Sequence, residues 1–97
     1  MNNAQRNFLK KAAHSLKPVV MIGQNGLNEQ VLKAAEEAIE SHELIKVKFQ
    51  DYKEAKREIA DELCNSLNAE SVSIIGNILT IYRPARDPGK RSIRLPD

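Results

Sequence analysis

The chain has 97 residues, of which 41% are hydrophobic and 29% charged, a composition typical of one globular domain with a core of ordinary size. Its single cysteine excludes an internal disulfide or a cysteine-based zinc site, and its apolar run at residues 19–22 is too short for a signal sequence or a membrane span, so we expect a cytoplasmic protein. The net charge of +2 is unevenly distributed: residues 1–26 hold four basic and no acidic residues, residues 27–81 hold six basic and eleven acidic ones, and residues 82–97 hold five basic and two acidic ones. This segregation predicts a surface that attracts phosphate on one side and repels it on the other.

The first predicted element is an amphipathic helix over about residues 4–15. Its predicted buried side is formed by Phe8, Leu9, Ala12 and Leu16. Arg6, Lys10 and His14 follow one another at intervals of four residues on the opposite side, with no acidic residue nearby. Pro18 helps to end the helix, and the basic row is a candidate contact for an anionic partner.

A short strand at residues 19–22 leads into the sequence Gly23-Gln24-Asn25-Gly26 and then into a helix that reaches about Ser41, with Asn28 as its N-cap. Two glycines three residues apart permit a sharp turn and a close approach of bare backbone to a ligand, and the start of a helix favours an anion. Because no Lys-Ser/Thr pair follows Gly26 and the dinucleotide pattern is missing, nucleotide cofactors and NTP hydrolysis are poor candidates. We therefore interpret these four residues as a site for a nucleic-acid backbone.

The rest of the chain predicts a strand at residues 44–49, a helix at about residues 53–67 and a hairpin of residues 71–75 and 78–82 around Gly76-Asn77. In the strand at 44–49, Lys46 and Lys48 alternate with apolar residues, which predicts one covered and one wetter face. Helical connections favour parallel pairing of the early strands, and the hairpin adds an antiparallel pair. The predicted fold is one α/β domain over residues 1–84, with element order αβαβαββ and a mixed four-stranded sheet. Residues 85–97 are rich in Pro, Gly and basic residues, so we expect a mobile basic tail.

The acidic residues of the middle segment are interpreted as ordinary solvated helix faces, because none is paired with histidine at ligand spacing. They are Glu36, Glu37, Glu40, Glu43, Glu54, Glu58, Asp61 and Glu62. Neither histidine nor Cys64 lies in a recognisable nucleophile motif, and Cys64 is expected to be a small, partly buried apolar residue. We predict no catalytic residue, no metal and no cofactor.

Three separated blocks of the sequence resemble the bacterial YhbY family, the stand-alone form of the CRM (chloroplast RNA splicing and ribosome maturation) domain. The blocks are residues 16–27, residues 42–48 and Tyr82-Arg83-Pro84, in the family's order between about Phe8 and Leu95. The resemblance implies a fold similar to the C-terminal domain of bacterial translation initiation factor three. It also implies RNA binding through a Gly-x-x-Gly loop like that of KH domains, and association with precursors of the large ribosomal subunit. Many loops of the family carry a basic residue between the glycines, whereas this one carries Gln24 and Asn25, so positive charge has to come from neighbouring residues.

We therefore expect a non-enzymatic RNA-binding protein that assists assembly of the large (50S) ribosomal subunit by binding structured ribosomal RNA, without membrane or small-molecule substrate. The expected RNA-binding residues are Arg6, Lys10, Lys17, Gly23, Gln24, Asn25, Gly26, Arg83 and Arg86. We expect the first helix, the glycine turn and the Arg83 end of the hairpin to meet in one patch. Two alternatives remain open: a protein-interaction module that docks its basic ends on an acidic protein surface, and a small enzyme that uses the glycine turn for a phosphorylated metabolite.

Overall fold

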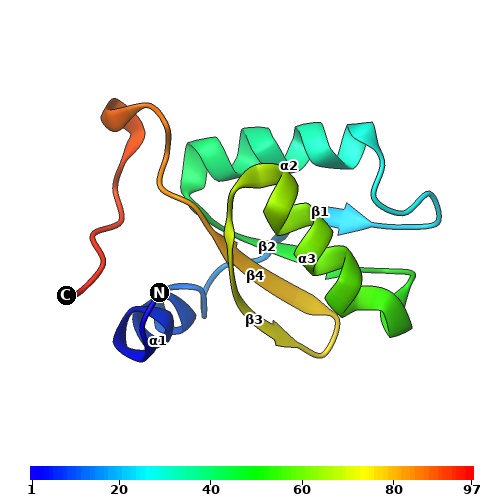
Figure 1. Cartoon of the computed structure of the whole chain (residues 1–97), viewed down its shortest axis with the longest axis horizontal. Coiled ribbons are helices and arrows are strands. Elements are labelled where there is room, and N and C mark those ends of the chain that lie inside the picture. The colour runs from blue at the N-terminus through cyan, green and yellow to red at the C-terminus, as the bar shows by residue number, and fades with distance from the viewer.

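The computed structural model describes all 97 residues and contains one four-stranded sheet with strand order β1-β2-β4-β3 (Figure 1). The strands are β1 (Pro18–Ile22), β2 (Leu44–Phe49), β3 (Glu70–Ile75) and β4 (Ile78–Tyr82). The helices are α1 (Asn3–Ala12), α2 (Glu29–His42) and α3 (Lys56–Leu67), with short 3-10 helices η1 (Lys53–Ala55) and η2 (Pro88–Lys90). β1 and β2 are parallel, and the other two pairs are antiparallel. The predicted element order and mixed sheet are confirmed.

The ends of the helices are fixed by local side-chain chemistry. The Asn2 side chain accepts from the Gln5 N–H, and the Gln5 side chain accepts from the Asn2 N–H, which forms a capping box at the start of α1. At the start of α2, the predicted N-cap Asn28 accepts from the Val31 N–H at 2.9 Å. α1 ends at Ala12, earlier than predicted, because the chain must turn back to place Pro18 beside β2.

The main core lies between α2, α3 and one face of the sheet. Ile45, Val47 and Phe49 of β2 point into it, together with Leu79 and Ile81 of β4. From the helices, the buried side chains are those of Ala35, Ile39, Ala60, Leu63, Cys64 and Leu67. Because strand side chains alternate between faces, Lys46 and Lys48 must point away from this core.

A second, smaller core forms on the other face of the sheet, where α1 covers one end. Leu9 and Ala13 pack there against Leu44, Val72 and Tyr82. The predicted buried side of this helix was partly wrong, because Ala13 is buried whereas Ala12 and Leu16 are exposed. α1 therefore covers only the ends of the strands, and the rest of this face has no helix over it.

The C-terminal segment, residues 85–97, packs on the domain. The Ala85 side chain is fully buried, and Ile93 and Leu95 pack against the second core. The buried Glu43 carboxylate accepts from the N–H groups of Ala85, Ser92 and Ile93 at 2.7, 2.8 and 3.0 Å. These contacts cross the expected boundary at residue 84, and where a mobile basic tail is expected the structure has a segment docked on the domain.

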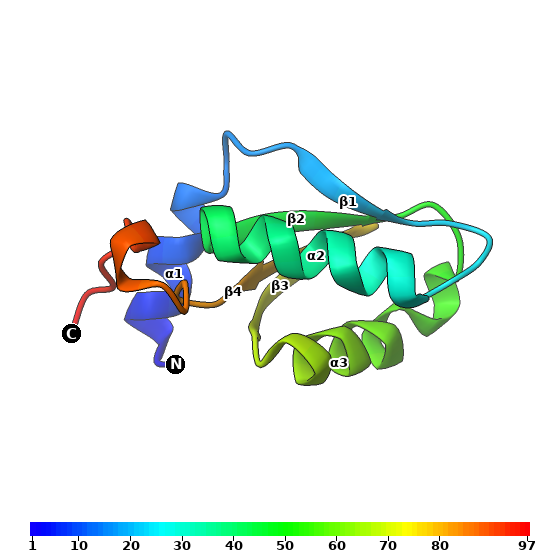
Figure 2. The same ribbon diagram turned by 90° about the horizontal axis from the view of Figure 1, so that it is seen from above.

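The molecule is elongated, with principal extents of 38 × 25 × 23 Å. Figures 1 and 2 both place the loop between β1 and α2 at one end of the long axis, and α1 with both chain termini at the other end. This arrangement decides which of the predicted site residues can act together.

Candidate nucleic-acid interface

The glycine loop, residues 23–26, is a tight turn at the end of β1. The Gly26 N–H donates to the Gly23 carbonyl at 3.0 Å, and Gly26 has a φ of +64°, a left-handed conformation that disfavours other residues. Gln24 and Asn25 between them are exposed, and no backbone carbonyl accepts from their N–H groups. Because the first glycine has no positive φ, only Gly26 is required by backbone conformation.

Tyr52 contacts the glycine loop through both its hydroxyl group and its ring. Its hydroxyl donates to the Gln24 carbonyl at 2.7 Å, and its ring lies so close to Gly26 that a Cβ there would be 3.4 Å from the ring. The turn before η1 is itself tied to β1, since the N–H groups of Gln50 and Asp51 donate to the Ile22 carbonyl. The loop is therefore supported by two segments and presents its outer amide groups to solvent.

The chain segments next to the glycine loop carry acidic residues as well as Lys53. Asp51 is tied to the end of β1, Glu29 lies in the first turn of α2, and the loop itself contains no basic residue. Among the residues paired with β1, Lys48 lies opposite Met21, just before the loop. Any anion that binds the loop therefore depends on lysines outside it for charge complementarity.

Next to the loop lies a sheet surface that no helix covers, which we call the open sheet face: Val19 and Met21 of β1 with Lys46 and Lys48 of β2. Val19 is 56% exposed and Met21 is 49% exposed. Lys46 and Lys48 are the only basic residues in the four strands, and the single acidic one, Glu70, lies on the edge strand β3. The surface is thus both apolar and positively charged.

Of the predicted residues on the N-terminal segment, Lys10 and Lys17 are exposed. Lys17 immediately precedes β1, so it lies at the end of the open sheet face opposite the glycine loop. A cavity of about 480 Å³ lies at this same end, with Leu16, Lys17, Val19 and His42 in its wall. Lys17, the open sheet face and the glycine loop therefore follow one another along β1.

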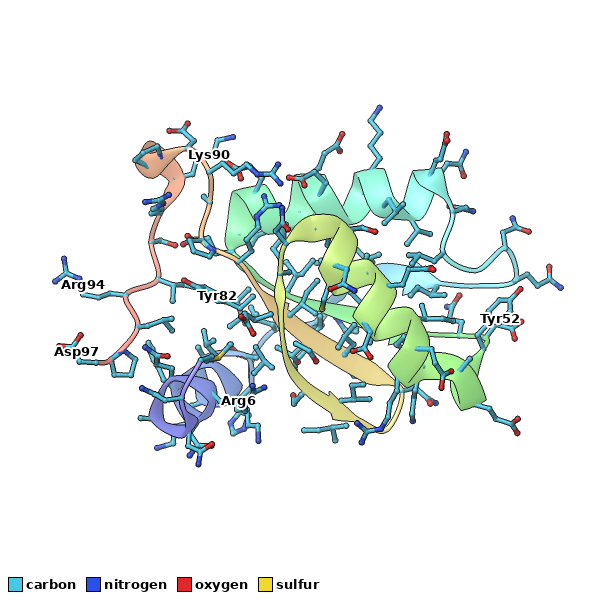
Figure 3. The ribbon with its side chains drawn as sticks, in the orientation of Figure 1. Arg6, Tyr52, Tyr82, Lys90, Arg94 and Asp97 are labelled. Atoms are coloured by element: carbon cyan, nitrogen blue, oxygen red, sulfur yellow. The ribbon has the colours of Figure 1, made fainter.

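Arg6 is placed differently from the prediction. Its guanidinium donates to the backbone carbonyls of Ser71 and Val72, which fastens α1 to β3. Figure 3 shows Arg6 at the α1 end of the molecule and Tyr52 at the opposite end. The residue is half-buried and has a structural role in this geometry.

Arg83 is the clearest correction. Its side chain is 5% exposed and donates to both Glu36 carboxylate oxygens at 2.9 and 2.8 Å, to Glu40 at 2.9 Å and to the Leu67 carbonyl at 3.1 Å. Arg86 is exposed but also donates to Glu36, at 3.2 Å. The Arg83 guanidinium is therefore buried and neutralised by carboxylates of α2, whereas the Arg86 side chain is 59% exposed and only one of its nitrogens is paired.

The three carboxylates that accept hydrogen bonds from residues 83–93 have lowered pKa values. Backbone N–H groups of Arg86 and Asp87 lower the pKa of Glu40 from 4.5 to about 2, and Arg83 contributes further. A hydrogen bond from Arg83 lowers the pKa of Glu36. Burial raises the pKa of Glu43, but hydrogen bonds from Ser92, Ala85 and Ile93 outweigh burial, so the net shift is downward. The interpretation of all eight acidic residues as solvated faces was therefore wrong for these three.

The expected convergence of three pieces in one patch is also wrong. β1 and β2 are parallel, so the glycine loop lies beside the C-terminal end of β2 at Phe49. β4 runs antiparallel to β2, so Arg83 follows the Tyr82–Leu44 pair at the other end of the sheet. Lys10, Lys17, the glycine loop and part of the Arg86 guanidinium remain as predicted sites with free polar groups, and Lys17 and the loop are linked by β1.

Sequence reasoning missed Tyr52 and the open sheet face. The alternation of Lys46 and Lys48 indicated a wetter strand face, but not that this face would continue across β1 to Val19 and Met21. Tyr52 carried no such signal, because its contact with Gln24 joins residues 28 positions apart.

No helix is long and apolar enough to cross a membrane. No group of three or more His, Cys, Asp or Glu side chains is arranged to hold a metal ion. Cys64 is buried, and burial, together with the charges of Asp61 and Glu70, raises its pKa to about 11.

Comparison with known proteins places this geometry in a family context. Residues 1–83 match the model of the CRS1/YhbY (CRM) domain. The chain is 43% identical to a Haemophilus influenzae RNA-binding protein, over 99% of this chain and 95% of that protein. It is 33% identical to Bacillus subtilis YqeI, named a probable RNA-binding protein, over 99% of both. The solution structure of a hypothetical protein from Staphylococcus aureus, described as a candidate RNA-binding protein, superposes with a TM-score of 0.82 at 33% identity, over 99% of both chains.

Proposed function

Since the chain belongs to the CRS1/YhbY (CRM) family, we propose that it is a non-enzymatic, cytoplasmic RNA-binding protein that assists assembly of the large ribosomal subunit by binding its ribosomal RNA. The observation that carries this proposal is the glycine loop. A supported turn with two exposed amide side chains and unpaired backbone N–H groups is suited to phosphate oxygens, which accept hydrogen bonds and need close approach.

In this proposal the loop positions the RNA backbone, and lysines supply the charge. The N–H groups of Gln24 and Asn25, with their side-chain amides, donate to phosphate or ribose oxygens. Lys17 and Lys10 contribute electrostatic attraction from the α1 side. Arg83 has no part in binding, because its guanidinium is already paired with carboxylates.

The affinity for RNA should depend strongly on salt. If about five phosphates are neutralised, a slope of roughly −0.7 per contact predicts a ~100-fold loss of affinity between about 50 and 200 mM salt. Filter binding of the purified protein to deproteinised large-subunit ribosomal RNA measures this slope. An affinity that hardly changes with salt contradicts the electrostatic mechanism.

The loop is tested by Gln24→Asp with Asn25→Asp, which places two negative charges at exposed positions. We expect binding to large-subunit RNA to weaken by about tenfold or more, equivalent to at least about 1.4 kcal/mol. The matched control is Asn65→Asp with Ser66→Asp on the exposed face of α3, which changes the net charge equally. Equal affinities of a folded loop variant and this control contradict a role of the loop.

The cellular part of the proposal has its own test. We expect the protein to sediment with precursors of the large subunit in a sucrose gradient and to leave those fractions after ribonuclease treatment. A protein-interaction module is the second candidate, because Val19, Met21 and Ile75 are apolar and exposed. Retention on ribosomal proteins after ribonuclease, without affinity for RNA, favours that alternative.

A further inference from the structure

The open sheet face lies beside the glycine loop and has no cover in the structure. Val19 and Met21, half exposed, form an apolar strip along the edge strand β1. Exposed apolar side chains gathered on one surface indicate contact with a partner. Neither the sequence pattern nor the family match assigns a role to this surface.

The charges next to the strip indicate what kind of partner fits. Lys48 pairs with Met21, and Lys46 pairs with Pro18, so each lysine lies directly beside the apolar strip. Lys17 precedes β1, a strand about 16 Å long in which Val19 and Met21 lie about 7 Å apart. A partner of this face therefore needs both negative charge at short intervals and flat apolar groups.

The opposite side of the molecule has the reverse character. There the exposed surfaces of α2 and α3 carry carboxylates, including the group Glu58, Asp61 and Glu62. A polyanion is thus repelled from the helical side and attracted to the open sheet face. An acidic protein segment shares the charge but lacks an apolar plane beside each negative group.

We propose that the open sheet face binds an unpaired stretch of RNA, with base faces on Val19 and Met21 and phosphates at Lys46, Lys48 and Lys17. This inference rests on the proposed RNA-binding function and deepens it, because it names the form of RNA and a second surface. In a duplex the base faces are stacked on one another and cannot reach the strip. The glycine loop, with its neighbouring Asp51 and Glu29, fixes the backbone, and the sheet lysines provide the charge that the loop lacks.

The electrostatic part is tested with Lys46→Gln plus Lys48→Gln, measured by fluorescence anisotropy with a labelled 12-nucleotide oligouridylate. We expect the log-log salt slope to decrease by about 1.4 and the affinity at 0.1 M salt to fall about 25-fold. The matched control is Lys33→Gln plus Lys90→Gln, two exposed lysines on α2 and the C-terminal segment. Indistinguishable slopes for the two double variants overturn the proposal.

The apolar part is tested with Val19→Thr plus Met21→Gln, which preserve side-chain size and suitability for a strand. We expect about 5-fold weaker oligouridylate binding with an unchanged salt slope, a smaller loss than that of an aromatic stacking partner. The control is Ile75→Thr, at a position 72% exposed on the same face of the sheet but on the opposite edge strand, three strand spacings from Met21, and it should bind as wild type. Oligouridylate must also bind more tightly than a 12-base-pair RNA duplex, and tighter binding of the duplex overturns the proposal.

The two proposals fail in different ways. If the wild type does not bind large-subunit ribosomal RNA, the proposed function is wrong. If it binds that RNA and depends on the glycine loop, but the sheet variants bind oligouridylate like their controls, only the inference about the open sheet face is wrong. If the sheet variants keep RNA affinity and instead lose association with a ribosomal protein, the face is a protein contact and the inference is equally overturned.

Discussion

Replacing Glu43 should release the C-terminal segment and destabilise the whole domain. This fully buried carboxylate follows α2 and accepts three backbone N–H groups from residues 85, 92 and 93. Its backbone has a φ of +65°, which is unfavourable for any residue with a side chain. The position is occupied by glutamate despite this strain, which indicates that the carboxylate is what the fold requires there.

The cost of Glu43→Ala can be bounded by two responses of the molecule. If the segment stays in place, one buried donor, the Ala85 N–H, loses its acceptor at about 1–3 kcal/mol, and two partly buried donors, those of Ser92 and Ile93, lose theirs at a smaller cost. If it detaches, the donors are hydrated, but the half-buried Ile93 and Leu95 lose their contacts, about half of 1.5–3 kcal/mol for each side chain. The variant adopts whichever of these two states has the lower free energy, so we expect the free energy of unfolding to fall by about 2–3 kcal/mol. Glu43→Gly should lose about 1 kcal/mol less, because glycine relieves the backbone strain.

Urea unfolding followed by circular dichroism measures these losses, with Glu37→Ala, at an exposed position of the preceding helix α2, as the control. Limited trypsin digestion at Arg91 and Arg94 reports release of the segment and should be faster in the Glu43 variants. A Glu43→Ala protein within about 0.5 kcal/mol of wild type, with unchanged digestion, would refute the role given to this carboxylate.

Three further predictions concern the glycines, acid stability and the cysteine. Gly26→Ala should destabilise the fold by about 1–2 kcal/mol because of its positive φ, whereas Gly23→Ala should leave stability within about 0.5 kcal/mol and weaken RNA binding. Because the pKa values of Glu40 and Glu43 are lowered in the folded state, their contribution is present above about pH 4.5 and is lost as the pH falls toward about 2, so the melting temperature should drop over this range, less steeply in Glu43→Ala. Since burial raises the pKa of Cys64 to about 11, its thiol should react with a disulfide reagent only when urea unfolds the chain.

Each of these predictions has a contradicting result. Equal stability of the two glycine variants would argue against the left-handed requirement at Gly26. A melting temperature that stays constant down to pH 2 would contradict the lowered pKa values. Rapid modification of Cys64 in the native protein would show that this part of the core opens easily.

The order of elements could be predicted from local patterns, but the position of the site depended on strand direction. Asn28 as a cap and Gly76-Asn77 as a hairpin turn follow from rules that act within a few residues, and the structure confirms both. The mixed sheet was also predicted. The strand directions of this predicted sheet already place the glycine loop and Arg83 at opposite ends, because a strand antiparallel to β2 must end where β2 begins.

The fate of Arg83 and of the C-terminal segment could not be predicted from composition. Arg83 meets Glu36 and Glu40 across 47 and 43 positions of sequence, and nothing in either segment marks the other as its partner. Residues 85–97 look like a free basic tail, yet two alternating apolar residues, Ile93 and Leu95, are sufficient to dock it when Glu43 satisfies its backbone. Long-range pairing of charges overrides the local signal here.

The placement of the chain ends has a practical consequence. Both termini emerge beside α1, at the end of the long axis away from the glycine loop (Figures 1 and 2). A dye, an affinity tag or an additional domain attached at either terminus would therefore lie at the α1 end of the molecule and would not block access to the glycine loop. We therefore expect a protein immobilised or fused through either terminus to bind a ligand at the glycine loop as the free protein does, so that binding can be measured on a surface.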